Sequence, residues 1–177
     1  QPHIVINDRL PGMGDYDTPE QALPRTPPAR AWETCMTMGH SWGNADAGRD
    51  HKSARYLLTV LAEVAGAGGN LLLNVSPDGR GVLPAWQRER LEAIADWMAR
   101  HGDAITECTR GLEPWQFYGP TSRKRERVFL FCPQRPQEFV VVRGIHGRRV
   151  EAVRALGSDR ALTFEPRLSA LDRMLGT

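Results

Sequence analysis

The sequence has no long apolar run, no strong excess of either charge and few cysteines. None of its apolar stretches approaches the roughly 20 residues that a membrane-spanning helix needs, so we expect a soluble chain with no membrane partner. The formal net charge of +2 at pH 7 does not by itself imply a polyanionic partner. With 41% hydrophobic and 25% charged residues in a chain of 177, the composition is typical of a globular protein with a sizeable core.

Cysteine and histidine chemistry is limited as well. The three cysteines, Cys35, Cys108 and Cys132, are odd in number and widely spaced, which favours free thiols over a disulfide framework. The five histidines lack the spacing of metal ligands, so we expect no metal site. The chain opens without an initiating Met or a recognisable signal peptide. That opening suggests a processed or excerpted chain and leaves its cellular compartment open.

The stretch around which the chain is organised is residues 68–81, GGNLLLNVSPDGRG. Its three consecutive leucines lie between Asn70 and Asn74 and are followed by turn residues. A run this short and continuously apolar predicts a strand that is covered on both faces, as in parallel sheets wrapped by helices.

Both flanks of this strand are amphipathic at helical spacing. A first helix is expected from Asp50 or Ser53, either of which could cap it, and it should end at the glycines that precede the strand. A second helix is expected over residues 84–100, with Pro84 at its first position. Helix, strand and helix with short connections predict an α/β sheet or barrel.

The first 48 residues predict two further strands and long loops. Residues 3–6, HIVI, have the composition of a buried strand that runs into polar residues, and residues 31–36 predict a second short strand. Between them, residues 10–30 contain five prolines and two glycines. We interpret this segment as a long loop, and long loops in compact domains are often functional.

The pattern changes after Glu113. Short strand-like runs separated by Gly, Pro or charged turns predict an antiparallel sheet or sandwich. We therefore expect two domains, an α/β domain over residues 1–110 and a β-domain over residues 111–177. The expected strands of the second domain are residues 115–118, 127–132, 139–143, 150–156 and 161–164.

Glu20 is the candidate catalytic carboxyl group. It lies in the proline-rich loop that should open at the carboxyl-terminal edge of the sheet. Aromatic and apolar neighbours could raise the pKa of a carboxylic acid there and suit it to general acid/base catalysis. The alternative is a solvated loop glutamate with no catalytic role.

Other residues near the expected strand ends could bind a polar ligand. Asp8 and Arg9 follow the first expected strand and could orient a polar ligand, or could instead form a local ion pair or loop hydrogen bonds. Trp42, between Ser41 and Gly43, could present its ring to the apolar face of a sugar. The basic run of residues 123–127 is interpreted as a solvated hairpin, with nucleic-acid binding as the alternative.

Together these motifs resemble the α-L-fucosidases of glycoside hydrolase family 29. The matching stretches, in order, are IVINDRL, DYDTPE, WETCMTMGHSWG, GGNLLLNVSPDGRGVLP, RERLEAIADWMARHGDAI and WQFYGPT. The resemblance spans nearly the whole chain. It implies the end of a (β/α)8-like catalytic barrel followed by most of a C-terminal β-sandwich, and no metal or organic cofactor.

The resemblance also implies a function and three site residues. Glu20 matches the family's general acid/base, Arg9 the arginine that binds fucose hydroxyls, and Trp42 the aromatic residue near the fucose methyl group. The implied activity is retaining hydrolysis of terminal α-L-fucose from glycoconjugates or oligosaccharides. The family's nucleophile is an aspartate on an earlier barrel strand, and no aspartate of this chain has that context. Asn44 also departs from the family's pattern, since many members have an aromatic residue there.

Three hypotheses follow from the sequence. The first is a fucosidase or part of one, whose second carboxyl group would come from elsewhere or from Asp8, Asp15 or Asp17. The second is a non-catalytic or degenerate sugar-binding fragment, and the third a nucleic-acid binder. We favour the first, with a fucosylated partner and no nucleic acid. An incomplete barrel would leave a sheet edge and apolar faces open, so we also expect a homo-oligomer.

Overall fold

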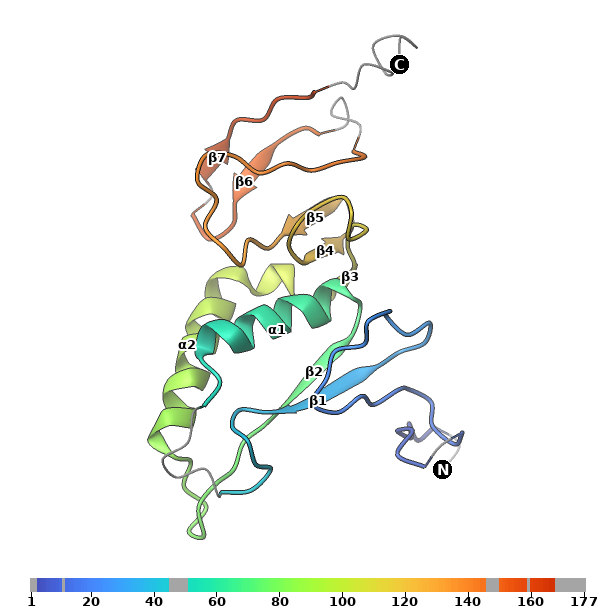
Figure 1. Ribbon diagram of the computed structural model, residues 1–177, viewed down its shortest axis with the longest axis vertical. Helices are drawn as coiled ribbons and strands as arrows, with labels where there is room; N and C mark the ends of the chain where they lie inside the picture. The colour runs from blue at the N-terminus through green and yellow to red at the C-terminus, as the bar shows by residue number, and fades with distance from the viewer. Residues whose placement is uncertain (1–2, 11, 45–50, 146–149, 159, 168–177) are drawn as a thin grey trace.

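A pair of parallel strands joins segments that lie far apart in the sequence. The computed structural model describes residues 3–10, 12–44, 51–145, 150–158 and 160–167. Within these, β1 (Glu33–Thr37) pairs in parallel with β2 (Asn70–Asn74), and Cys35 lies opposite Leu72. The connection between them passes through helix α1 (Ala54–Gly66), which lies against one face of the pair (Figure 1). The β–α–β arrangement expected from the flanks of the leucine run is confirmed.

Extended chain continues this sheet on the other side of β1. Asp17 forms a parallel bridge with Trp32, and Glu20 forms one with Cys35. Four backbone hydrogen bonds of 2.8–3.0 Å join the two segments, and none of them uses the nitrogen of Pro19, because proline has no N–H. The interpretation of residues 10–30 as loop throughout is therefore wrong for residues 17–21. Their strand character was hidden by the proline-rich composition.

The strand expected over residues 3–6 does not form. Ile4, Val5 and Ile6 are all exposed, at 56%, 70% and 46% of their surface. Their neighbour in the structure is a short stretch at residues 15–16, through an isolated parallel bridge between Asn7 and Tyr16. The apolar composition signalled a buried strand, but among the described residues no helix or sheet covers this one.

Helix α1 begins as the sequence predicts. The Ser53 hydroxyl accepts a hydrogen bond of 3.1 Å from the backbone N–H of Tyr56, which satisfies one of the N–H groups left free at a helix start. Asp50, the other candidate cap, lies outside the described residues. The helix ends at Gly66, and Ala67 caps it through backbone bonds, as the glycine-rich end of the segment predicted.

The cap gives a test of local stability. We expect Ser53→Ala to lower the free energy of unfolding by about 1 kcal/mol, since it leaves the Tyr56 N–H without its side-chain acceptor. Urea unfolding followed by circular dichroism measures the change. Ser53→Asp, which keeps an acceptor at the cap, should stay close to the parent, and a loss as large as that of the alanine variant would contradict the capping role.

The core lies between α1 and one face of the parallel strands. Trp32 and Met36 from the β1 side pack with Val60 and Val64 of α1, and Leu71 of β2 joins them. On the other face, the side chain of Leu72 is 50% exposed. The prediction that this strand is covered on both faces is wrong, because the described residues supply a helix on one side only.

Helix α2 (Ala85–His101) packs against α1 and starts one residue later than expected, with Pro84 as its N-cap. The helical spacing predicts an inner face, all of which is half-buried, made of Trp86, Arg90, Leu91, Ile94, Trp97 and Met98. The buried residue of the helix is Gln87. Its side-chain amide donates to the Ser76 hydroxyl and accepts from the Ser76 N–H, at 2.5 and 2.9 Å. These bonds fix the start of α2 to the segment that leaves β2.

The C-terminal part is antiparallel, as predicted, but in shorter pieces. A three-stranded sheet contains β3 (Thr109–Arg110), β4 (Thr121–Lys124) and β5 (Arg127–Leu130), and β6 (Val153–Ala155) pairs with β7 (Arg160–Leu162). The strands expected over residues 115–118 and 139–143 are wrong, since neither segment forms a ladder. Phe139 and Val141 are exposed there, with no neighbouring strand among the described residues.

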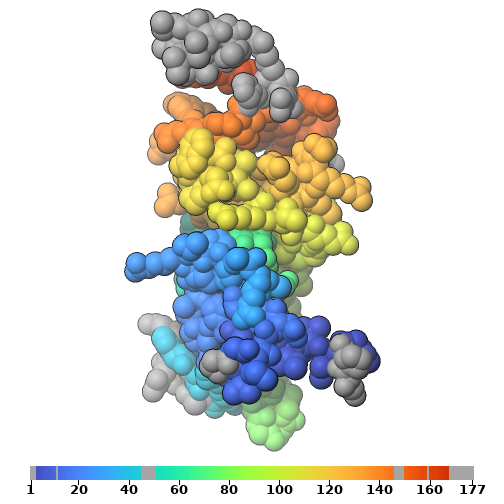
Figure 2. Space-filling view, turned by 90° about the vertical axis from the view of Figure 1, so that its right-hand side faces the viewer, coloured from blue at the N-terminus to red at the C-terminus, as the bar shows by residue number. Residues whose placement is uncertain are grey.

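The antiparallel sheet rests on the end of α1. A Cβ atom on Gly66 would lie 2.6 Å from the carbonyl oxygen of Thr121, so only glycine allows this approach. The buried Ser122 hydroxyl donates to the carbonyl of Ala104, at 2.6 Å. Figure 2 shows the antiparallel part stacked directly on the α/β part. A domain boundary at residues 110/111 stays a prediction.

Candidate functional site

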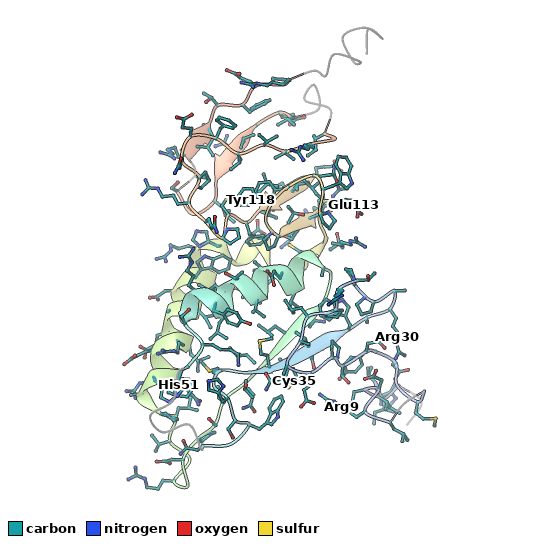
Figure 3. All side chains as sticks on the ribbon, in the orientation of Figure 1. Arg9, Arg30, Cys35, His51, Glu113 and Tyr118 are labelled. Carbon is teal, nitrogen blue, oxygen red and sulfur yellow. The ribbon has the colours of Figure 1, made fainter. Side chains whose placement is uncertain are left out.

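Arg9 and Glu20 contact each other directly. The Arg9 guanidinium donates to the Glu20 carboxylate and forms an ion pair with it. This hydrogen bond is the main reason why the pKa of Arg9 is raised above its ordinary value. Arg9 and Cys35 lie on the side of β1 that faces away from α1 (Figure 3). Two residues expected to belong to the site are therefore brought together, although eleven positions separate them in the sequence.

The backbone around Glu20 is held by Cys35. The Cys35 N–H donates to the carbonyl of Pro19 at 3.0 Å, and the N–H of Gln21 donates to the carbonyl of Cys35 at 2.8 Å. Paired positions of neighbouring strands project to the same face of a sheet, so Glu20, Cys35 and Leu72 form a row across the open face. Burial raises the pKa of the Cys35 thiol, so this thiol stays protonated beside the ion pair.

The three aspartates considered as a second carboxyl group are all engaged locally. Asp8 accepts from the Thr18 hydroxyl and, at 2.9 Å, from the Thr18 N–H, and the hydroxyl bond is the main cause that lowers its pKa. Asp17 is bound by Arg30, whose Nε lies 2.7 Å from it. Asp15 accepts from the N–H of Ile6 at 2.8 Å.

Arg30 is a residue that the sequence reasoning missed. Its guanidinium also donates to the carbonyl of Gly14 at 2.6 Å and lies 3.8 Å from Asp8. Its hydrogen bond to Asp17 is the main cause that raises its pKa. Arg30 thus ties three parts of the N-terminal segment together. The only sequence signal was an arginine placed just before a predicted strand.

Trp42 lies in the loop that follows β1 and is 41% exposed. Its backbone carbonyl accepts a hydrogen bond of 3.0 Å from the Asn74 side chain at the end of β2. Trp42 is thereby attached to the carboxyl-terminal end of the parallel strands, where α/β folds place their sites. Within the described part of the chain, no hydrogen bond joins Trp42 to Arg9 or Glu20.

The basic run of residues 123–127 forms the β4–β5 hairpin, as interpreted from the sequence. Lys124 and Arg127 both pair with Asp103, at 3.0 and 2.7 Å, so part of its positive charge is neutralised within the chain. Over the described ranges, no three His, Cys, Asp or Glu side chains gather as a metal ion would require. In the same ranges, neither helix is both long and apolar enough to cross a membrane.

Comparison with protein families matches residues 1–103 to the family model described as Alpha-L-fucosidase. The plasma α-L-fucosidase of Rattus norvegicus is 39% identical over 180 residues, which cover 91% of this chain and 39% of that protein. A putative α-L-fucosidase of Caenorhabditis elegans is 37% identical over 137 residues, covering 67% of this chain and 26% of that protein. The chain therefore spans between 26% and 39% of the length of these two relatives.

Solved structures of similar proteins agree. The α-L-fucosidase isoenzyme 1 of Paenibacillus thiaminolyticus superposes with a TM-score of 0.87 at 28% identity, covering 97% of this chain and 44% of that one. A family 29 α-L-fucosidase of Bacteroides thetaiotaomicron, trapped as a covalent intermediate with 2-fluoro-fucosyl fluoride, gives 0.79 at 25% identity. That match covers 89% of this chain and 38% of the other.

Proposed function

The chain belongs to the α-L-fucosidase family, and from this membership we propose that it forms the part of a retaining α-L-fucosidase that carries the general acid/base. The substrate class is a glycoconjugate or oligosaccharide with a terminal α-L-fucose. The observation that carries the proposal is the contact between Arg9 and Glu20 on the open face of the parallel strands.

The architecture belongs to the same proposal. Four parallel segments lie side by side in the order of the sequence: residues 7, 16–20, 32–37 and 70–74. Successive strands of a (β/α)8-like barrel are arranged in the same way. Their open face, with Leu72 and the ion pair, then corresponds to the barrel interior. The three-stranded and two-stranded antiparallel sheets of the C-terminal part would belong to a β-sandwich.

The ion pair suggests how the site prepares for catalysis. A general acid has to carry a proton when the glycosidic oxygen departs, whereas Glu20 is ion-paired in the free chain. Fucose hydroxyls that accept hydrogen bonds from Arg9 would draw the guanidinium away from the carboxylate. Glu20 would then be placed to donate a proton to the leaving oxygen and later to remove one from water.

A retaining mechanism needs a second carboxyl group about 5 Å from the acid. Because Asp8, Asp15 and Asp17 are each held by local hydrogen bonds, we propose that none of them attacks the sugar. The nucleophile would then be a different carboxylate, and the family resemblance implies an aspartate on an earlier barrel strand. The covalent intermediate trapped in the Bacteroides thetaiotaomicron relative supports this type of mechanism.

Fucose binding by Arg9 and Trp42 tests the assignment. We expect Arg9→Ala to weaken fucose binding by about tenfold to a hundredfold, because a hydrogen bond from a charged group contributes about 1.5–3 kcal/mol. Trp42→Ala should weaken it by roughly twofold to tenfold, from lost aromatic packing. Isothermal titration with fucose measures both changes.

Matched controls are available on exposed surface elsewhere. Arg88 lies on the outer side of α2, and Trp115, outside the parallel strands, is 61% exposed. Arg88→Ala and Trp115→Ala should leave fucose binding unchanged. Equal affinities in the site variants and the controls would show that Arg9 and Trp42 do not hold the sugar.

The second hypothesis, a sugar-binding chain without catalysis, shares the same residues. It is favoured if fucose raises the unfolding temperature of the chain while no fucoside is hydrolysed under any condition. Because ligand stabilisation grows with ligand concentration relative to Kd, a fucose titration of the unfolding temperature separates binding from turnover.

A further inference from the structure

Gln21, the residue after Glu20, has an unusual backbone. Its φ angle is +54°, in the left-handed region that residues with a side chain rarely adopt. The chain turns there and leaves the ladder with β1, directly after the Gln21 N–H has donated to the carbonyl of Cys35. A left-handed residue persists only where its surroundings hold it, and such residues cluster at functional sites.

The side chain of Gln21 makes the hydrogen bonds that keep its backbone in this left-handed conformation. Its Nε2 donates to the hydroxyl of Thr37 at 2.9 Å, and its Oε1 accepts from the backbone N–H of Thr37 at 3.2 Å. Both ends of the amide therefore bind one residue at the end of β1. Thr37 is only 1% exposed, so the partner is fixed within the fold.

Thr37 is anchored in turn. Its hydroxyl donates to the carbonyl of Gly39 at 2.6 Å. The Lys52 ammonium donates to the Thr37 hydroxyl at 3.3 Å and to the Gly39 carbonyl at 2.9 Å. Lys52 lies just before the start of α1. The neighbouring turn residue is fixed as well, since the buried hydroxyl of Thr34 donates to the carbonyl of Ala22 at 2.9 Å.

We propose that Gln21 is a positioning residue that sets the place of Glu20 by joining the turn after it, through Thr37 and Lys52, to the start of α1. The assignment rests on the proposed role of Glu20 as general acid/base. Without the amide, the turn is free to leave the left-handed region. The ladder with Cys35 then loosens, and the Glu20 carboxyl group no longer occupies a fixed position beside Arg9.

The first test uses variants that separate the amide from the backbone. Gln21→Gly keeps a residue that tolerates a positive φ and removes the amide. Thr37→Val removes the hydroxyl at nearly the same volume, and Thr37→Ser keeps it. Gln137→Gly, at an exposed loop position in the C-terminal part, is the matched control for the loss of a glutamine.

In an active form of the enzyme, the readout is the ratio of kcat/KM for a fucosyl disaccharide to kcat/KM for an aryl fucoside. We expect Gln21→Gly to lower this ratio by about tenfold or more, since a misplacement of about 1 Å can reduce a rate about 100-fold. The effect should fall on the disaccharide, whose poor leaving group depends on the acid. Thr37→Val should also lower the ratio, whereas Thr37→Ser and Gln137→Gly should leave it unchanged. In the Gln21→Gly/Thr37→Val double variant, the ratio should fall little below that of Gln21→Gly alone.

Equal losses on both substrates, together with a lower unfolding temperature, would reduce Gln21 to a structural role and overturn the proposal. An unchanged ratio in Gln21→Gly would overturn it as well. So would strictly additive losses in the double variant, because they would mean that the two residues act independently.

Amide hydrogen exchange in the 177-residue chain separates failure of this proposal from failure of the proposed function. Gln21→Gly and Thr37→Val should accelerate exchange at the Cys35 N–H, which donates to the carbonyl of Pro19. If Glu20→Gln itself fails to discriminate between the two substrates, the acid/base assignment is wrong. In that case only the exchange rate of the Cys35 N–H tests whether Gln21 fixes the backbone at residue 20. An unchanged exchange rate in Gln21→Gly would refute the positioning role.

Discussion

Glu20→Gln is expected to reduce hydrolysis of natural fucosyl sugars by about 10²- to 10⁴-fold in an active form of the enzyme, the range that general acid/base catalysis contributes. A sugar is a poor leaving group, so under the proposed assignment its departure depends on a proton from Glu20. A nitrophenyl group leaves readily without that proton, so glycosylation by an aryl fucoside should fall far less. Steady-state kinetics on the two substrates measures the difference.

Azide supplies a second, independent readout for Glu20. After fucose is transferred to the enzyme, water needs a base in order to attack, whereas azide does not. Azide should therefore restore part of the aryl-fucoside turnover of the Glu20→Ala variant and yield a fucosyl azide, detectable by mass spectrometry. If both substrates are lost equally and azide restores nothing, Glu20 is not the acid/base.

Glu33 is the matched control carboxylate for these experiments. It belongs to β1, two positions before Cys35, and is half-buried. Glu33→Gln should keep the parent's ratio between the two substrates. A leaving-group pattern that appears in Glu33→Gln and not in Glu20→Gln would move the acid/base to β1.

The second large effect concerns the two faces of the parallel strands. Met36, at 3% exposure, points into the cluster with α1, whereas Leu72, at 50% exposure, lies on the open face. We expect Met36→Ala to lower the free energy of unfolding by about 2–5 kcal/mol, through lost burial and the cavity left behind. Leu72→Ala should change it by less than about 1 kcal/mol, because half of that side chain already contacts water.

Chemical denaturation over a range of protein concentrations measures both values and also tests the homo-oligomer expected from the sequence. If a second copy covers the open face, Leu72→Ala becomes more destabilising as the concentration rises, and its unfolding midpoint shifts with it. Equal and concentration-independent losses for Met36→Ala and Leu72→Ala would mean that both faces are buried within one chain.

Much of the fold could be predicted from short stretches of sequence. The apolar face of α1, the Ser53 cap and the glycines after the helix are neighbours along the chain, so their pattern is legible without tertiary contacts. The leucine run of β2 and the amphipathic pattern of α2 are equally local. The exposed residues 3–6 show the limit of such reasoning, since an apolar composition indicates burial only when another element is there to cover it.

The candidate site could be predicted residue by residue but not as an arrangement. Placement near expected strand ends and in loops singled out Arg9, Glu20 and Trp42, and the family resemblance assigned their roles. The direct contact of Arg9 with Glu20 and the anchoring of Gln21 on Thr37 had no signal in the sequence. The ion pair between Arg30 and Asp17 had no signal in the sequence either, because an arginine can pair with any carboxylate that the fold brings near it.

The sequence by itself determined the two helices, the Ser53 cap, the β–α–β order and the family to which the chain belongs. All of these depend on residue types and spacings within short windows. Only the tertiary structure decided that residues 17–21 align with β1, that one face of the strands stays open, and that Glu20 is held between Arg9 and Cys35. The physical reason is that pairing between strands is set by contacts between distant segments, and a proline within one of them conceals its strand character from any local pattern.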